Sequence, residues 1–112
     1  MKCEVRKAGK VTLFSVQGDV IFNQMSEIRE MVMGEIVHSS NGKFLLILGG
    51  VDLIDSSGVG FIISVYKTAV SRNGKFAIVC PKSDVTTVLQ TVGLVPRLFN
   101  IYENEDEAIK AF

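Results

Sequence analysis

The sequence predicts a single α/β domain, residues 1–112, with a mixed, mostly parallel sheet and an antiparallel hairpin at its N-terminus. Three observations lead to this prediction. The chain has 112 residues, of which 47% are hydrophobic, and this is enough for one compact core. Apolar runs of strand length alternate with segments of helical periodicity. Two strand-like segments precede the first helix, so the predicted order is β-β-α-β-α-β-α-β-α.

The N-terminal third holds the predicted hairpin and the first helix. Residues 2–7 and 10–17 have the composition of strands separated by a short turn. Both alternating sets of residues in 10–17 are partly apolar, so this strand is expected to be covered on both faces. A helix is predicted from a cap at Asn23 to about His38, because apolar residues recur at helical spacing, namely Met25, Ile28, Val32 and Ile36.

Three further segments have strand character. Residues 44–48 form the continuous apolar run Phe-Leu-Leu-Ile-Leu, which is typical of a central strand buried on both faces. Residues 76–80 predict another buried strand, and residues 99–102 predict a short last one. Helical segments separate these strands, so they are expected to run parallel to one another.

Local signals mark the ends of the last two helices. Ser83 is predicted to cap a third helix. Gly93 is predicted to end that helix, with Leu94 folding back in a Schellman motif. Asn104 and Glu107 have the spacing of a capping box at the start of a final helix.

Charge and cysteine content argue against several kinds of partner. Twelve lysines and arginines balance twelve aspartates and glutamates, so neither nucleic acid nor an anionic membrane is expected to bind. Cys3 and Cys80 form no metal-binding pattern, so we expect two buried or half-buried thiols and no metal or cofactor. No apolar run approaches the roughly 20 residues of a membrane-spanning helix, and the N-terminus lacks the apolar core of a signal peptide. These features predict a cytoplasmic protein.

The most informative segment is residues 51–60, Val-Asp-Leu-Ile-Asp-Ser-Ser-Gly-Val-Gly, where a second helix is expected to begin. Aspartate and serine at a helix start accept hydrogen bonds from free backbone N–H groups, so a well-made cap is the simplest interpretation. One helical stripe is predicted to pack on the sheet, namely Val59, Ile62, Ile63, Tyr66 and Val70.

Phe61 and Val65 then fall on the opposite side of this helix, beside Gly60 and Ser64. Packing on one sheet face does not require a phenylalanine there, so these four residues predict an exposed docking surface for a partner. The alternatives are contact with a neighbouring helix or self-association.

Motif spacing does not favour an enzyme. Ser56 lacks the first glycine of a Gly-x-Ser-x-Gly nucleophile elbow, and Ser57 lacks both glycines. Neither a complete dinucleotide fingerprint nor a Gly-Lys-Ser/Thr phosphate loop is present. His38, the single histidine, falls near a helix end, where a solvated cation is favourable. A serine–histidine pair stays open as an alternative.

Residues 54–60, Ile-Asp-Ser-Ser-Gly-Val-Gly, resemble the D-S-S-G-[LV]-G signature of anti-sigma factor antagonists, which are stand-alone members of the sulfate transporter and anti-sigma factor antagonist (STAS) domain family. The resemblance covers nearly the whole chain, including Gly18, the turn at 73–76, the helix end at 88–94 and the acidic helix start at 103–108. Two positions depart from the family pattern. Ile21 and residues 48–50, Leu-Gly-Gly, stand where acidic or amide residues are usual.

The resemblance implies a STAS-like fold and a bacterial regulator that switches partners. It implies that a serine kinase, itself an anti-sigma factor or a similar regulator, phosphorylates Ser56, with Asp55, Ser57 and Gly58 as flanking site residues. The unphosphorylated protein would bind the anti-sigma factor or kinase, and the phosphorylated protein would release it. A serine phosphatase would reset the switch.

The same residues permit two other interpretations. One is a non-switching STAS adaptor subunit of a larger sensory or transport complex, in which the serine is silent. The other is a nucleotide- or small-ligand-binding module that uses residues 55–60 as an anion site.

Overall fold

The structure is a computed structural model, and it describes residues 2–21, 25–39 and 42–112. The first part of the chain forms β1 (Lys2–Ala8), β2 (Val11–Gln17), α1 (Ser26–Val37) and β3 (Lys43–Gly50). The second part forms α2 (Ser56–Ser71), β4 (Lys75–Val79), α3 (Ser83–Thr91), β5 (Ile101–Tyr102) and α4 (Glu105–Ala111). The predicted order of strands and helices is confirmed.

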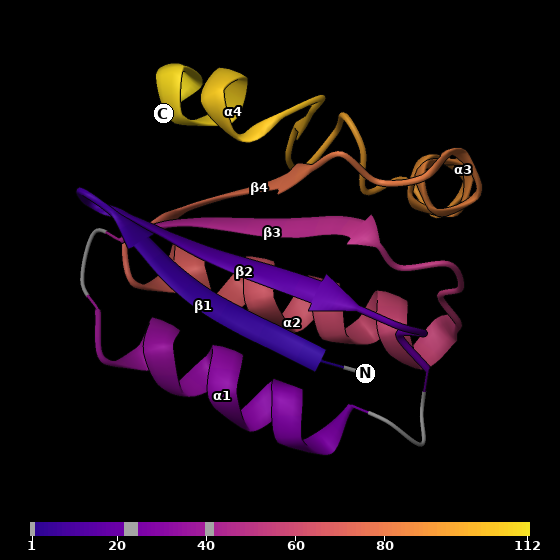
Figure 1. The fold of residues 1–112 in the computed structure, drawn as a ribbon, viewed down its shortest axis with the longest axis horizontal. Coiled ribbons are helices and arrows are strands. Elements are labelled where there is room, and N and C mark those ends of the chain that lie inside the picture. Colours follow the sequence, from indigo (N-terminus) through magenta and orange to yellow (C-terminus); the bar gives the residue numbers. More distant parts are fainter. Residues whose placement is uncertain (1, 22–24, 40–41) are drawn as a thin grey trace.

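The described strands form one mixed sheet in the order β1-β2-β3-β4-β5 (Figure 1). β1 pairs antiparallel with β2, from Lys2 opposite Gln17 to Ala8 opposite Val11. All other neighbours are parallel. The sequence prediction of a parallel sheet with an antiparallel N-terminal hairpin is therefore confirmed.

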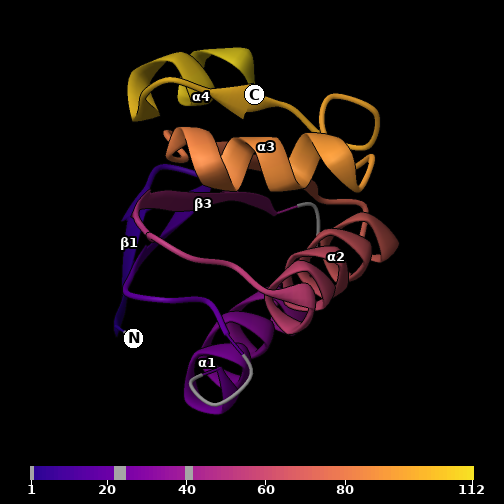
Figure 2. The same cartoon turned by 90° about the vertical axis from the view of Figure 1, so that its right-hand side faces the viewer.

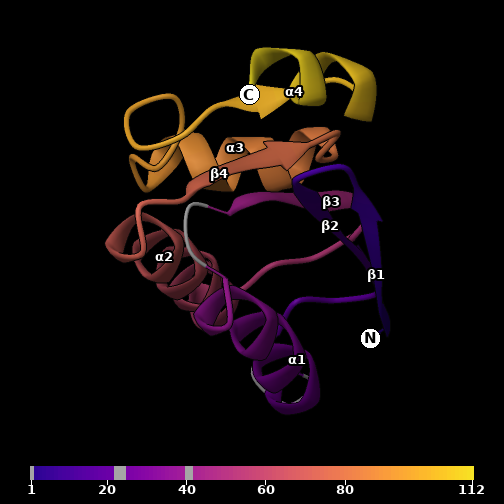
Figure 3. The ribbon, with the colours of Figure 1, turned by 90° about the vertical axis from the view of Figure 1, so that its left-hand side faces the viewer.

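The helices cover both faces of this sheet. α1 and α2 lie on one face, and α4 lies on the other (Figures 1 and 3). α3 lies beyond the carboxyl ends of β3 and β4, where Val85 and Leu89 join the core formed with α1 and α2 (Figure 2). On the α4 face, Ala108 closes a smaller core over β2, β3 and β4 that contains Val11, Leu13, Leu45, Ala77 and Val79.

Burial explains why the central strands are so apolar. β3 has neighbours on both edges and helices over both faces, and Phe44, Leu45 and Leu46 are at most 2% exposed. The predicted inner stripe of α1 is also confirmed, because Met25, Ile28, Val32 and Ile36 are all buried. The strand at 11–17 is covered on both faces, as its two apolar sets predict.

Most of the predicted helix ends are found in the structure. Gly93 has a φ of 80° and donates its N–H to Gln90, while the N–H of Leu94 bonds to Leu89, as a Schellman motif requires. Asn104 caps α4 through the N–H of Glu107.

The predicted caps at Ser83 and Asn23 are not confirmed. Ser83 is the first residue inside α3, and Lys82 takes the cap position without a side-chain bond, so the cap prediction for Ser83 is wrong by one residue. The predicted cap at Asn23 lies outside the described residues.

Cys3 and Cys80 are half-buried and free, as the sequence predicts. Burial, together with the neighbouring Glu4 carboxylate, raises the pKa of the Cys3 thiol above its ordinary value of 9.0. In the part of the chain that the structure describes, we find no helix with the length and apolarity needed to span a membrane.

Candidate functional site

Two adjacent loops position the start of α2. The chain leaving β2 and the chain leaving β3 run side by side, and Val20 forms a parallel bridge with Ile54. The Val20 N–H donates to the Leu53 carbonyl at 2.8 Å, and the Asp55 N–H donates to the Val20 carbonyl at 3.3 Å. Val20 and Ile54 are both buried, so the segment that precedes Ser56 is anchored to the core on one side and to a neighbouring loop on the other.

Asp55 is the N-cap of α2. Its backbone is extended, and its Oδ1 accepts a hydrogen bond of 2.8 Å from the Gly58 N–H. Its carbonyl accepts the Val59 N–H at 2.9 Å, which is the first bond of the helix. A carboxylate in this position satisfies one otherwise unpaired N–H group and faces the positive end of the helix dipole. The cap that the sequence predicts is therefore present.

Gly58 lets α2 approach the Val20 loop. A Cβ at this position would lie 2.3 Å from the Val20 carbonyl oxygen and 2.7 Å from Ile54 Cγ1. A side chain would therefore push the first turn of α2 away from the loop that supports it. The glycine is needed for this close contact and not for its backbone angles, because Gly58 lies within the helix.

The two serines occupy different environments. Ser56 is the first residue of α2 and is exposed to solvent. Its hydroxyl makes no hydrogen bond with any residue that the structure describes. Ser57 is half-buried and lines a hollow of about 490 Å³ between the starts of α1 and α2. Of the two, Ser56 is therefore the hydroxyl that a second protein reaches more easily.

Arg29 supplies the positive charge of this hollow. Its Nη2 donates to Ser64 Oγ at 3.3 Å, and Ser64 Oγ in turn donates to the Gly60 carbonyl at 3.0 Å. Met25, Ser26 and Ser57 complete the lining. No local sequence signal predicts this role of Arg29, because Arg29 and Ser64 are 35 positions apart and lie on different helices.

The prediction that Phe61 and Val65 belong to an exposed docking surface is wrong. Phe61 is 2% exposed and Val65 is fully buried, and both belong to the core between α2 and the sheet. Gly60 is exposed and Ser64 is half-buried, so only these two of the four predicted docking residues lie toward the surface. The inner stripe of α2 is completed by Gly58, Ile62 and Ala69.

The apolar surface next to Ser56 consists of other residues. Leu53 is 55% exposed, and Val59 and Ile63 are half-buried. Residues 56, 59, 60 and 63 follow one another at helical spacing on the less buried side of α2, where Val59 and Ile63 also pack partly against the core. We name Leu53, Ser56, Val59, Gly60 and Ile63 the Ser56 surface. It combines the exposed hydroxyl with the exposed Leu53 before it and the partly exposed Val59 and Ile63 after it on the helix.

An ion pair between Lys82 and Asp52 joins the same loop to the start of α3. Both side chains are substantially exposed, so the pair orients the loop more than it stabilises the fold. The exposed Leu53 follows Asp52 directly, so this contact helps to fix the apolar edge of the Ser56 surface.

His38 lies at the wrong end of the molecule for catalysis with Ser56. It is the C-cap of α1, whereas the hollow that holds Ser57 is formed by the first residues of that helix. Twelve helical residues separate the two ends, which is about 18 Å at 1.5 Å per residue. A serine–histidine pair is therefore not formed. Within the described ranges, no cluster of three or more histidine, cysteine, aspartate or glutamate side chains could hold a metal ion.

The two departures from the family pattern also have a structural setting. Ile21 is half-buried and directly follows the bridge residue Val20. At Gly49, a Cβ would lie 2.9 Å from Cys80 Sγ, so a larger side chain would have to displace that thiol. The neutral residue at position 49 is thus matched to its neighbour on the next strand.

Comparison with known proteins gives a consistent result. The model of the STAS domain family matches residues 2–108. A candidate anti-sigma factor antagonist of Thermotoga neapolitana is 34% identical over 82 residues, which are 73% of this chain and 72% of that protein. The crystal structure of a candidate anti-sigma factor antagonist of Thermotoga maritima has a TM-score of 0.89 at 25% identity, covering 97% of this chain and 92% of that one.

Bacillus SpoIIAA, an anti-sigma factor antagonist, shares the fold at 19% identity. Its unphosphorylated form has a TM-score of 0.83 and covers 98% of this chain and 95% of its own. Its phosphorylated form has a TM-score of 0.78, and 98% of each chain is covered.

Proposed function

The chain belongs to the STAS domain family, and we propose that it acts as an anti-sigma factor antagonist that is switched by reversible phosphorylation of Ser56. The observation that carries the proposal is the position of the Ser56 hydroxyl. It is exposed at the first residue of α2, it is not used in capping, and an aspartate cap holds the turn beneath it. A kinase acceptor needs an accessible hydroxyl, and this one is exposed and takes no part in the cap.

In the proposed cycle, the unphosphorylated protein binds an anti-sigma factor or serine kinase through the Ser56 surface. The kinase transfers the γ-phosphoryl group of ATP to Ser56 Oγ, which loses its proton, and ADP is released. A serine phosphatase later hydrolyses the phosphoester. The setting of this cycle is the cytoplasm of a bacterium, in keeping with the Thermotoga relatives.

The phosphate acts on the interface rather than on the fold. It adds about −1.5 to −2 charges at neutral pH. At the N-terminus of α2 this charge meets the positive end of the helix dipole, an interaction of about 0.3–1 kcal/mol in favour of the folded state. When a partner covers Leu53, Val59 and Ile63, however, the same charge must lose its water. We therefore expect phosphorylation to leave the domain folded and to weaken partner binding.

A binding experiment with matched variants tests this function. Wild type, Ser56→Ala, Ser56→Asp and Ser57→Ala are immobilised, and the proteins that each retains from a lysate of the source cells are identified. We expect a kinase-like or anti-sigma protein on wild type, Ser56→Ala and Ser57→Ala, and its loss from Ser56→Asp. Incubation with ATP should place phosphate on wild type and on Ser57→Ala, but not on Ser56→Ala.

Equal retention of one partner by all four forms would contradict the switch. Ser56 would then be only part of a helix start, and the protein would be a permanent adaptor subunit. Retention of nucleotide by the isolated domain would instead support a ligand-binding module.

A further inference from the structure

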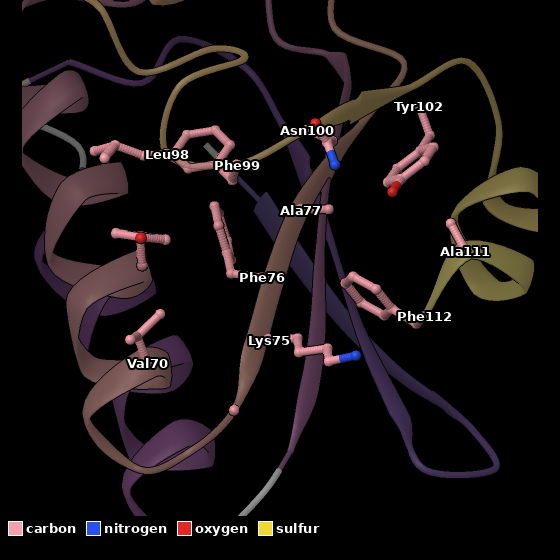
Figure 4. Close-up of a pocket in the computed structure, with 12 residues that line it drawn as sticks. Val70, Lys75, Phe76, Ala77, Leu98, Phe99, Asn100, Tyr102, Ala111 and Phe112 are labelled. Carbon is pink, nitrogen blue, oxygen red and sulfur yellow. The ribbon is translucent and has the colours of Figure 1, made fainter.

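A second hollow lies at the β4 edge of the sheet, away from the Ser56 surface. In the described part of the chain, β5 pairs with β4 only at Ile78 and Val79. Residues 75–77 of β4 therefore have no strand beside them on that side. A hollow of about 330 Å³ occupies this place, and both α2 and the end of α4 contribute to its walls (Figure 4).

Backbone hydrogen-bonding groups of β4 point into this hollow. The Lys75 N–H donates to the Gly42 carbonyl on the β3 side, whereas the Ile78 N–H donates to the Asn100 carbonyl on the β5 side. Backbone groups alternate in direction along a strand, so the N–H and C=O of Phe76 face the same side as those of Ile78. Phe76 therefore offers one donor and one acceptor to a strand that would lie in the hollow.

The two walls of the hollow differ in chemistry. One wall is apolar and consists of Tyr66, Val70, Phe76, Leu98 and Phe99. Its outer members, Val70 and Leu98, are 47% and 43% exposed, and Phe76 and Phe99 pack edge to face with ring centroids 5.0 Å apart. The other wall holds Lys75, Tyr102, Ala111 and Phe112 (Figure 4). Lys75 carries the only charged side chain among the twelve lining residues.

The opposite edge of the sheet is protected in a way that this one is not. β1 exposes Lys2, Glu4, Arg6 and Lys7. Arg6 forms an ion pair of 2.9 Å with Glu105, and Lys7 forms one of 3.5 Å with Glu35. Charged side chains on an edge strand discourage pairing with another chain. The open part of β4 carries Lys75 alone and has apolar residues beside it.

The shape of the hollow selects among possible occupants. The β4 edge is recessed between the α2 wall and the end of α4 (Figure 4). A single extended segment needs only the width of one strand beside β4, whereas the edge strand of a folded domain brings covering helices or loops with it. The open stretch of three residues, 75–77, is about 10 Å long at 3.3 Å per residue.

We propose that this β4 groove binds an extended peptide segment of a partner protein, which adds to the sheet beside residues 75–77. Alternate side chains of the segment are apolar and pack on Val70, Phe76 and Leu98. The intervening side chains are acidic and lie toward Lys75, because side chains of a strand alternate between its two faces. Main-chain hydrogen bonds to Phe76 hold the segment, and the two walls favour a sequence in which apolar and acidic residues alternate. This site is separate from Ser56 and does not depend on the proposed switch.

Nuclear magnetic resonance titration of the full isotope-labelled chain tests the groove. The probe is a capped octapeptide of alternating glutamate and valine, and the control peptide has lysine in place of glutamate. We expect amide shifts at Phe76 and Ala77 with the glutamate peptide, and binding about fivefold weaker with the lysine peptide. Lys75→Glu should reverse this preference. Lys67→Glu, which changes an exposed lysine on α2 outside the groove, should leave the preference unchanged.

A second pair of peptides tests backbone pairing. In one, every valine nitrogen of the glutamate peptide is methylated, and in the other every glutamate nitrogen is. Alternate N–H groups of a strand point to opposite sides, so either the valine or the glutamate N–H groups, but not both, donate to β4. Methylation of the donating set should abolish binding, whereas methylation of the other set should leave the affinity unchanged. Shifts absent from Phe76 and Ala77 at millimolar peptide, equal affinity of both methylated peptides, or an unchanged preference in Lys75→Glu would each overturn the proposal.

Discussion

Gly58 lies directly against the backbone of Val20, so that a Cβ on Gly58 would stand 2.3 Å from the Val20 carbonyl oxygen. That carbonyl also accepts the Asp55 N–H. The supporting loop therefore fixes both the cap residue and the first turn of α2. The position of Ser56, which lies between Asp55 and Gly58, depends on this contact.

The first prediction concerns Gly58→Ala. The added methyl group meets a backbone atom that cannot rotate away, so we expect the free energy of unfolding to fall by about 1–3 kcal/mol. Urea denaturation followed by circular dichroism measures the change. Gly60→Ala is the matched control, because no atom lies within 4 Å of the corresponding Cβ. There alanine should stabilise the helix by about 0.5–1 kcal/mol. Equal effects of the two substitutions would contradict the close contact at Gly58.

The second prediction concerns the cap. Asp55→Ala removes the acceptor of the Gly58 N–H and should lower the free energy of unfolding by about 1 kcal/mol. Asp55→Asn keeps an oxygen in the same place and should lose much less. Ser56→Ala should change stability by less than about 0.5 kcal/mol, because its hydroxyl makes no bond with the described residues. If Ser56→Ala cost as much as Asp55→Ala, Ser56 would be part of the cap after all.

The third prediction follows from the pKa of Cys3. Partial burial disfavours the thiolate and the Glu4 carboxylate opposes it further, so less thiolate is present at a given pH than in the unfolded chain. A raised pKa in the folded state stabilises the fold fully below the ordinary value of 9.0, and this contribution is lost as the pH rises through the folded pKa. Alkylation of Cys3 by iodoacetamide at pH 8 should be slower in the folded protein than in urea, as peptide mass spectrometry would show. Equal alkylation rates in the folded protein and in urea would contradict a raised pKa of Cys3 in the folded state.

Strong local patterns allowed much of the fold to be predicted. The apolar run at 44–48 identified the central strand, and the Gly93-Leu94 pair identified a helix end that the hydrogen bonds confirm. The Val20–Ile54 bridge could not be predicted, because its two residues are 34 positions apart and neither has a local signal. The cap of α3 was misplaced because Ser83 and Lys82 are neighbours and only the serine has a capping side chain.

The candidate site was predicted in part. Asp55, Ser56 and Gly58 are found where the segment 54–60 placed them, at the start of α2. The buried face of α2 was predicted only in part. Ile62 is buried, and Val59, Ile63 and Tyr66 pack against the core, but Val70 is 47% exposed. Val59, Ile63 and Val70 have larger side chains than Gly58 and Ala69, yet the small residues lie inside. Gly58 lies inside because the Val20 loop packs directly against it, and periodicity contains no information on such tertiary contacts.

The fourth prediction separates the two stripes by experiment. Phe61→Ala should lower the free energy of unfolding by about 3–5 kcal/mol, because it empties a fully packed position in the core. Leu53→Ser should change it by less than about 0.5 kcal/mol, since Leu53 is 55% exposed. Chemical denaturation of both variants gives the comparison. In the pull-down from cell lysate, Leu53→Ser should reduce retention of the partner although the domain stays folded. Full retention of the partner by Leu53→Ser would show that Leu53 takes no part in partner binding.

The fifth prediction concerns stability and binding together in Ser56→Asp. A negative charge at the first residue of α2 meets the helix dipole, so the free energy of unfolding should stay equal or rise by about 0.3–1 kcal/mol. Salt should reduce this gain, because the charge is exposed. Binding to the partner retained by the wild type should nevertheless weaken about a hundredfold, a loss of roughly 2.7 kcal/mol, because the charge is desolvated in the interface. Denaturation and titration calorimetry on the same preparation measure the two quantities. If Ser56→Asp lost binding only in proportion to a loss of folded protein, the charge would act on the fold, and the proposed switch at the interface would be wrong.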